Sequence, residues 1–159
     1  MQITIAAVGK VREPFLQAGC AEYLKRLGRY ATLNVAEVAE DPVPETLSLA
    51  EQAQVLVREG ERLRRALREG SYVIALAREG RAFTSEAFAA HLQHLALTGT
   101  SSLSVVIGGS LGLAPALEAD ANLRLTFGTF TYPHQLIRLI LLEQLYRAFK
   151  IIRGEPYHK

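Results

Sequence analysis

The sequence predicts an α/β fold in which a mostly parallel sheet is flanked by helices. Two observations lead to this prediction. Short apolar segments typical of strands alternate along the chain with segments of helical periodicity, a pattern that produces parallel sheets. The chain has 159 residues, a length that favours one domain spanning residues 1–159.

The first half of the chain predicts two strands and two helices. Residues 2–8 form a short apolar segment ended by Gly9, as expected of a buried strand. Residues 13–30 repeat apolar side chains at helical spacing, and residues 32–39 alternate as a second strand does. Residues 49–68 give the clearest amphipathic helix, because their leucines step by three and four and stay on one side.

The second half continues the alternation. Apolar segments at residues 72–77, 103–107 and 122–127 predict three more strands. Helices are expected at residues 84–96 and, after a proline, at 115–120. The sheet therefore has five expected strands.

The last expected helix, residues 134–151, is apolar nearly all the way round. A surface helix of a small domain is normally apolar on one side only. A helix buried on two sides needs two partners, of which one is its own sheet. The simplest second partner is another copy of the chain, so we expect a homodimer.

Charge is unevenly distributed along the chain. Residues 1–30 carry five Lys/Arg and two acids, residues 31–123 carry seven and twelve, and residues 124–159 carry six and two. If the basic ends meet in the fold, they form a positive face suited to a phosphate backbone. On charge alone, scattered solvated side chains explain the same pattern.

Several classes of protein are disfavoured by the sequence. The single cysteine, Cys20, allows no disulfide within the chain, and no signal peptide is evident, so we expect a cytoplasmic protein. The apolar stretch 136–145 is too short to span a membrane. His91 and His94 are three residues apart, but no further ligands accompany them, so no metal site is expected.

Two loops that follow late strands are candidates for ligand binding. Residues 107–115 hold three glycines in five positions, which allows the backbone to approach a ligand closely, although a tight structural turn explains them equally well. Residues 127–133 combine aromatic and small side chains suited to an adenine ring. The glycines fit neither the dinucleotide G-x-G-x-x-G pattern nor a phosphate-binding Walker A loop.

The segments VVIGGSLGL and LTFGTFTYPHQLIRLILLEQLYRAFKIIRGEPYHK closely resemble the bacterial RlmH family. Members of this family are SPOUT-class methyltransferases that act on N3 of a pseudouridine in 23S ribosomal RNA. The resemblance covers the whole chain, including the opening strand and Gly9–Lys10.

The resemblance implies a C-terminal trefoil knot, with a cofactor-binding region at about residues 103–159. It implies S-adenosylmethionine as cofactor and a homodimer with shared active sites. It implies a 23S rRNA stem-loop as substrate, presented on the large subunit or whole ribosome, with no DNA or membrane partner. The cofactor positions that match are Leu76, Gly108, Phe127, Gly128, Thr129, Phe130, Thr131 and Tyr132.

Methyl transfer to N3 also requires removal of a proton from the base. Candidate general bases are His134, Tyr157 and His158, although His134 equally fits a packing role at a helix start. Arg138 is a candidate for stabilising charge at the catalytic site.

The basic residues Arg153 and Lys159 are candidates for binding RNA. The tail from Glu155 to Lys159 is expected to be irregular, because Gly154 and Pro156 interrupt the helix.

Two other functions remain open at the level of sequence. One is a non-catalytic RNA- or ribosome-binding module, in which the glycine loop is only structural. The other is a SPOUT methyltransferase that acts on tRNA. Binding of S-adenosylmethionine separates the first alternative from an enzyme, and activity on isolated tRNA separates the second.

Overall fold

The computed structural model describes residues 1–157 and contains a five-stranded sheet in the order β2-β1-β4-β3-β5. All neighbouring strands are parallel, which confirms the predicted fold class. The central strands β1 and β4 are almost entirely buried, because helices cover both faces of the sheet. The strands are β1 (Gln2–Val8), β2 (Thr32–Val38), β3 (Tyr72–Arg81), β4 (Ser102–Ile107) and β5 (Leu123–Leu125).

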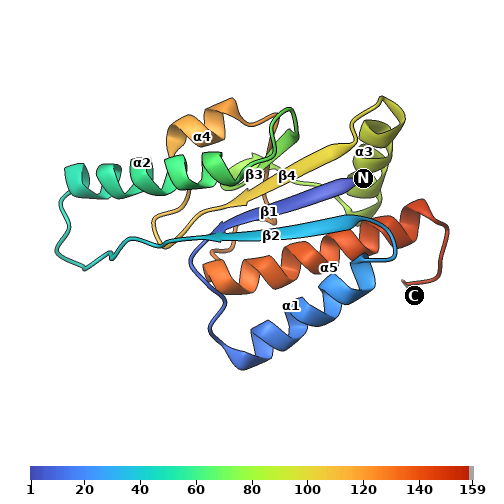
Figure 1. Cartoon of the computed structure of the whole chain (residues 1–159), viewed down its shortest axis with the longest axis horizontal. Coiled ribbons are helices and arrows are strands. Elements are labelled where there is room, and N and C mark those ends of the chain that lie inside the picture. Colours follow the sequence, from blue (N-terminus) through green and yellow to red (C-terminus); the bar gives the residue numbers. More distant parts are fainter. Residues whose placement is uncertain (158–159) are drawn as a thin grey trace.

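Five helices cover the sheet in two layers. They are α1 (Pro14–Leu27), α2 (Leu49–Ala66), α3 (Ser85–Leu97), α4 (Pro115–Asp120) and α5 (His134–Ile152). Helices α1, α3 and α5 pack on one face, and α2 and α4 pack on the other (Figure 1). The crossover from β4 to β5 passes over β3, so the last three loops gather near one another.

Local sequence fixes where the helices begin. Ser48 and Glu51 form a reciprocal capping box at the start of α2. The Thr84 side chain accepts a hydrogen bond from the Ala87 amide and caps α3. Proline occupies the first turn of both α1 and α4, where its missing amide hydrogen costs nothing.

Helix α5 lies between α1 and α3 of the same chain. This bears on the homodimer that was expected from the apolar surface of the helix. Leu141 and Leu145 of α5 are fully buried, and Leu139 lies against Gly19 of α1. Much of the two-sided apolar pattern is therefore satisfied within one chain, so the pattern alone does not require a second copy. The homodimer stays a prediction of the resemblance, as does the trefoil knot.

Strand β3 differs most from expectation. It continues to Arg81, past the expected end at residue 77, and its register with β5 changes between Leu76 and Arg81. A side chain at Gly80 would lie 2.6 Å from the Arg124 carbonyl oxygen, so only glycine allows this close approach. Within residues 1–157, no helix is long and apolar enough to cross a membrane.

Candidate functional site

A cavity lies at the carboxyl ends of β3, β4 and β5. This is the edge at which open α/β sheets bind ligands. Its walls come from residues 76–78 of β3, from the loops after β4 and β5, and from the first turn of α5. The lining residues are 76–78, 107–112, 126–128, 130–132, 134 and 137.

The cavity brings together seven of the eight residues expected to bind the cofactor. Leu76 belongs to β3, and Gly108 and Phe127 belong to the loops after β4 and β5. The three meet because the strand order places β3 between β4 and β5. Thr129 is the exception, because it is exposed and does not line the cavity. Phe130 is 81% exposed at its rim.

The glycine loop after β4 folds back on itself. Gly109 and Gly112 form an isolated bridge, and Gly112 has a φ of 89°, which favours glycine. A Cβ atom on Gly108 would lie 2.2 Å from the Gly112 carbonyl oxygen. The sequence left open whether these glycines form a ligand-binding loop or a tight structural turn. In the structure the loop is a tight turn and also lines the cavity, so the two interpretations are compatible.

We expect Gly108→Ala to lower stability and cofactor affinity together. The added methyl group meets backbone atoms of Gly112 and Leu113 and cannot be accommodated by a side-chain rotation. Thermal denaturation with and without S-adenosylmethionine measures both effects. A variant with wild-type melting temperature and wild-type affinity contradicts this account of the loop.

His134 is the one candidate base that lies at the cavity among the described residues. It is the first residue of α5, and its Nε2 atom lies 4.0 Å from Oε1 of Glu40. The Ser110 hydroxyl donates a hydrogen bond of 3.2 Å to the same carboxylate oxygen. Glu40 was not identified from the sequence, because it follows β2 and only the fold brings it beside the cavity residues Ser110 and His134.

A second acid missed from the sequence, Glu59, lies behind the glycine loop. It belongs to α2, is 2% exposed, and accepts a hydrogen bond from the Asp41 amide. Burial raises the pKa of this carboxyl. A Cβ atom on Gly109 would lie 3.1 Å from its Oε2 atom, so Glu59 supports the loop from the side away from the cavity.

Arg138 is placed differently from expectation. It is 3% exposed, and its guanidinium donates hydrogen bonds to the carbonyl oxygens of Val8 and Gly9 and to Glu37. It does not line the cavity. A guanidinium committed to these three acceptors holds the β1–α1 loop, so a catalytic role for Arg138 is not proposed.

Tyr157 packs beside the middle of α5 and does not line the cavity. Its hydroxyl is 3.3 Å from that of Tyr23 and donates a 3.1 Å hydrogen bond to Glu143. Its ring packs edge-on against Tyr146. Burial, followed by these two partners, raises the pKa of Tyr157 strongly, so its hydroxyl keeps its proton at neutral pH. Tyr157 is therefore placed to anchor the tail and not to accept a proton.

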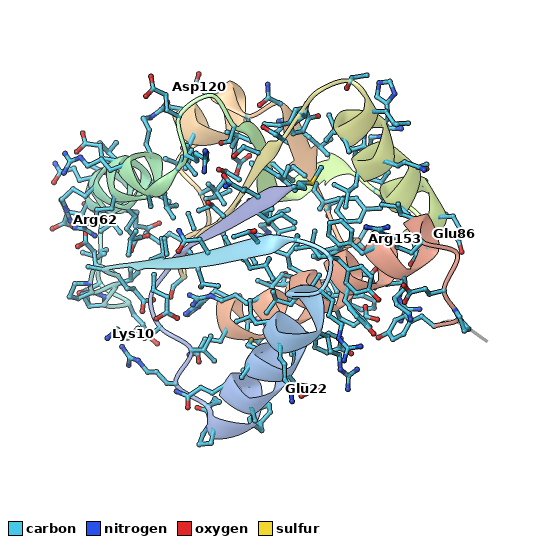
Figure 2. All side chains as sticks on the ribbon, turned by 45° about the vertical axis from the view of Figure 1, so that its right-hand side comes forward. Lys10, Glu22, Arg62, Glu86, Asp120 and Arg153 are labelled. Atoms are coloured by element: carbon cyan, nitrogen blue, oxygen red, sulfur yellow. The ribbon has the colours of Figure 1, made fainter. Side chains whose placement is uncertain are left out.

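Of the remaining tail candidates, the structure describes Arg153, which lies far from the cavity of its own chain. Helix α5 has 19 residues and is about 28 Å long at 1.5 Å per residue. Arg153 follows its last turn and is exposed, on the opposite side of the molecule from Lys10 (Figure 2). His158 and Lys159 lie outside the described residues.

Comparison with known proteins gives one consistent family. A family model described as "Predicted SPOUT methyltransferase" matches residues 1–158. "Ribosomal RNA large subunit methyltransferase H" of Carboxydothermus hydrogenoformans is 55% identical over 159 residues, covering 100% of both chains. The protein of the same name from Bifidobacterium adolescentis is 52% identical with the same coverage.

Solved structures share the fold at low sequence identity. A "Probable Methyltransferase" from Bordetella pertussis has a TM-score of 0.58 and 14% identity, covering 92% of this chain and 95% of its own. A tRNA (m1G37) methyltransferase from Aquifex aeolicus has a TM-score of 0.53 and 12% identity, covering 100% and 75%. At these identities the likeness concerns the fold alone.

Proposed function

The chain belongs to the SPOUT methyltransferase family, and from this premise we propose that it methylates N3 of a pseudouridine in 23S ribosomal RNA. We propose S-adenosylmethionine as the methyl donor and a stem-loop on the large subunit or whole ribosome as substrate. The names of full-length relatives at 50–55% identity support an activity on large-subunit rRNA. The cavity at the carboxyl edge of the sheet is the observation that carries the proposal.

The cavity has the composition that an adenosine group requires. Leu76, Ile107 and Ile137 offer apolar surface for a base. The glycine loop and the loop at residues 126–132 offer backbone donors and acceptors, and Gly108 and Gly109 keep side chains out of the way. When bound there, S-adenosylmethionine supplies an activated methyl group. The chain's own contribution is then to orient the acceptor base and manage its N3 proton.

His134 is the described residue best placed to receive that proton. It lines the cavity, and Glu40 and Ser110 form a polar group beside it. Histidine is the side chain that most often serves as a general base. His158 stays a second candidate, contributed by the tail of a partner subunit.

The homodimer is part of the same proposal. Tyr157 is held beside the middle of α5, whereas the cavity is lined by the first turn of this helix, so the described part of the tail does not reach the cavity of its own chain. Two copies of the chain, with the tail of each at the cavity of the other, supply both parts. Sedimentation at micromolar concentration tests it, and a monomeric protein would exclude the shared site.

A pair of variants in one loop tests the cofactor site. Thr131 and Thr129 are both exposed, but only Thr131 lines the cavity. We expect Thr131→Arg to fill part of the cavity and weaken S-adenosylmethionine binding about 100-fold or more, a change of roughly 2.7 kcal/mol. Thr129→Arg adds the same charge outside the cavity and should keep wild-type affinity. Calorimetry measures both.

The same titration, together with a methylation assay on isolated tRNA and on ribosomal particles, separates the proposal from its alternatives. A wild-type chain that binds no S-adenosylmethionine is a binding module and not an enzyme. Equal losses in both variants move the cofactor away from this cavity. Methylation of isolated tRNA in place of ribosomal particles would assign the enzyme a different substrate.

A further inference from the structure

The loop between β1 and α1, residues 9–13, lies beside the cavity. Strand β1 is the neighbour of β4, so this loop leaves the sheet next to the glycine loop. The Arg12 amide donates a 2.7 Å hydrogen bond to Gln135, the residue after His134. A Cβ atom on Gly9 would lie 3.0 Å from Glu40, the acid that also approaches His134.

The backbone of this loop is held from several directions. Arg138 of α5 donates to the carbonyl oxygens of Val8 and Gly9. The Val11 amide donates to Glu37, and its carbonyl accepts a 2.8 Å hydrogen bond from Gln17. A buried guanidinium is costly to desolvate, so its use here indicates that the position of the loop matters.

The side chains of Lys10 and Arg12 are exposed from this fixed backbone. Within residues 1–157, the ion pairs with carboxylates are made by other cations, and neither Lys10 nor Arg12 takes part in one. The arginines of α2 are different, since Arg62 pairs with Asp41 and Arg64 with Asp120. Figure 2 shows Lys10 at the periphery of the molecule.

We infer that the β1–α1 loop is a phosphate-binding site for the RNA substrate, with Lys10 and Arg12 contacting the backbone next to the target base. Phosphate contacts fix the register and orientation of a nucleic acid without reading its sequence. Two cations on a rigid loop beside the cavity are suited to that task. The inference rests on the proposed function, because it requires an RNA substrate at this edge of the sheet.

The test compares two double variants that remove equal charge. Lys10→Ala/Arg12→Ala removes the proposed contacts, and Lys25→Ala/Arg29→Ala removes two exposed cations at the other end of α1. Binding to unmethylated large ribosomal subunits is measured without cofactor over a series of potassium chloride concentrations at fixed magnesium. We expect the first variant to bind about tenfold more weakly and its log–log salt slope to fall by about 2. The control should keep the wild-type slope.

Every outcome bears on the inference. An unchanged salt slope in Lys10→Ala/Arg12→Ala overturns it, and so does an equal loss in the control, which would indicate a general charge effect. A wild-type protein that does not bind the particle also overturns it. Calorimetry with S-adenosylmethionine should give wild-type affinity for both variants, which shows that the fold and cavity are intact. Failure of the wild type to bind cofactor would instead refute the proposed function.

Discussion

Replacing Arg138 with methionine is expected to lower the free energy of unfolding by about 3–5 kcal/mol. The side chain is buried, and its removal leaves the carbonyl oxygens of Val8 and Gly9 without these donors and Glu37 without its buried partner. Methionine fills similar space but cannot donate. Urea denaturation at one fixed protein concentration measures the loss.

A control variant separates the ion pair from the backbone contacts. Glu37→Gln keeps a polar side chain beside Arg138 and leaves its bonds to Val8 and Gly9 in place, so we expect a smaller loss. If Arg138→Met unfolds at the wild-type urea concentration, the guanidinium does not hold the loop.

Deleting residues 157–159 is expected to reduce methylation of ribosomal particles by at least about 100-fold while S-adenosylmethionine binding is kept. Tyr157 is held against the middle of α5 and does not line the cavity of its own chain, so its loss should leave that cavity unchanged. The Tyr157 hydroxyl bonds to Glu143 and its ring packs on Tyr146, and these contacts anchor the tail. The comparison variant Tyr157→Phe keeps the ring packing and should retain much more activity than the deletion.

Mixed dimers test whether the tail acts on the partner's cavity. A subunit lacking residues 157–159 has an intact cavity, and a Thr131→Arg subunit has an intact tail. Neither homodimer should be active, but a mixed dimer combines one intact cavity with one intact partner tail. Recovered activity in the mixture supports the shared site. Absence of recovery, with mixed dimers shown to form, contradicts it.

Much of the fold was predictable because the local signals agree. Helix caps such as Ser48 and Thr84, and apolar segments such as residues 2–8, specify elements without reference to distant contacts. The length of β3 was not predictable, because its extension to Arg81 depends on pairing with β5. The apolar surface of α5 suggests a second subunit when only the sequence is considered, but helices α1 and α3 of the same chain cover much of it.

The residues of the candidate site also fall into those that the sequence identified and those that only the structure showed. Gly108 and Phe127 were recognisable because they lie in motifs that the resemblance covers. Glu40 and Glu59 were not, because nothing in the local sequence distinguishes them from surface acids. The role of Arg138 also required the structure, since its acceptors Val8 and Gly9 lie about 130 residues away in the chain.

The most direct test of the account is to locate the transferred methyl group. Purified protein, S-adenosylmethionine with a labelled methyl group and unmethylated ribosomes are incubated together, and the labelled nucleotide is mapped by mass spectrometry of 23S rRNA fragments. The account predicts one labelled position, a pseudouridine carrying the label on N3. Label on another base, on another atom of that base or on no ribosomal RNA at all would contradict it.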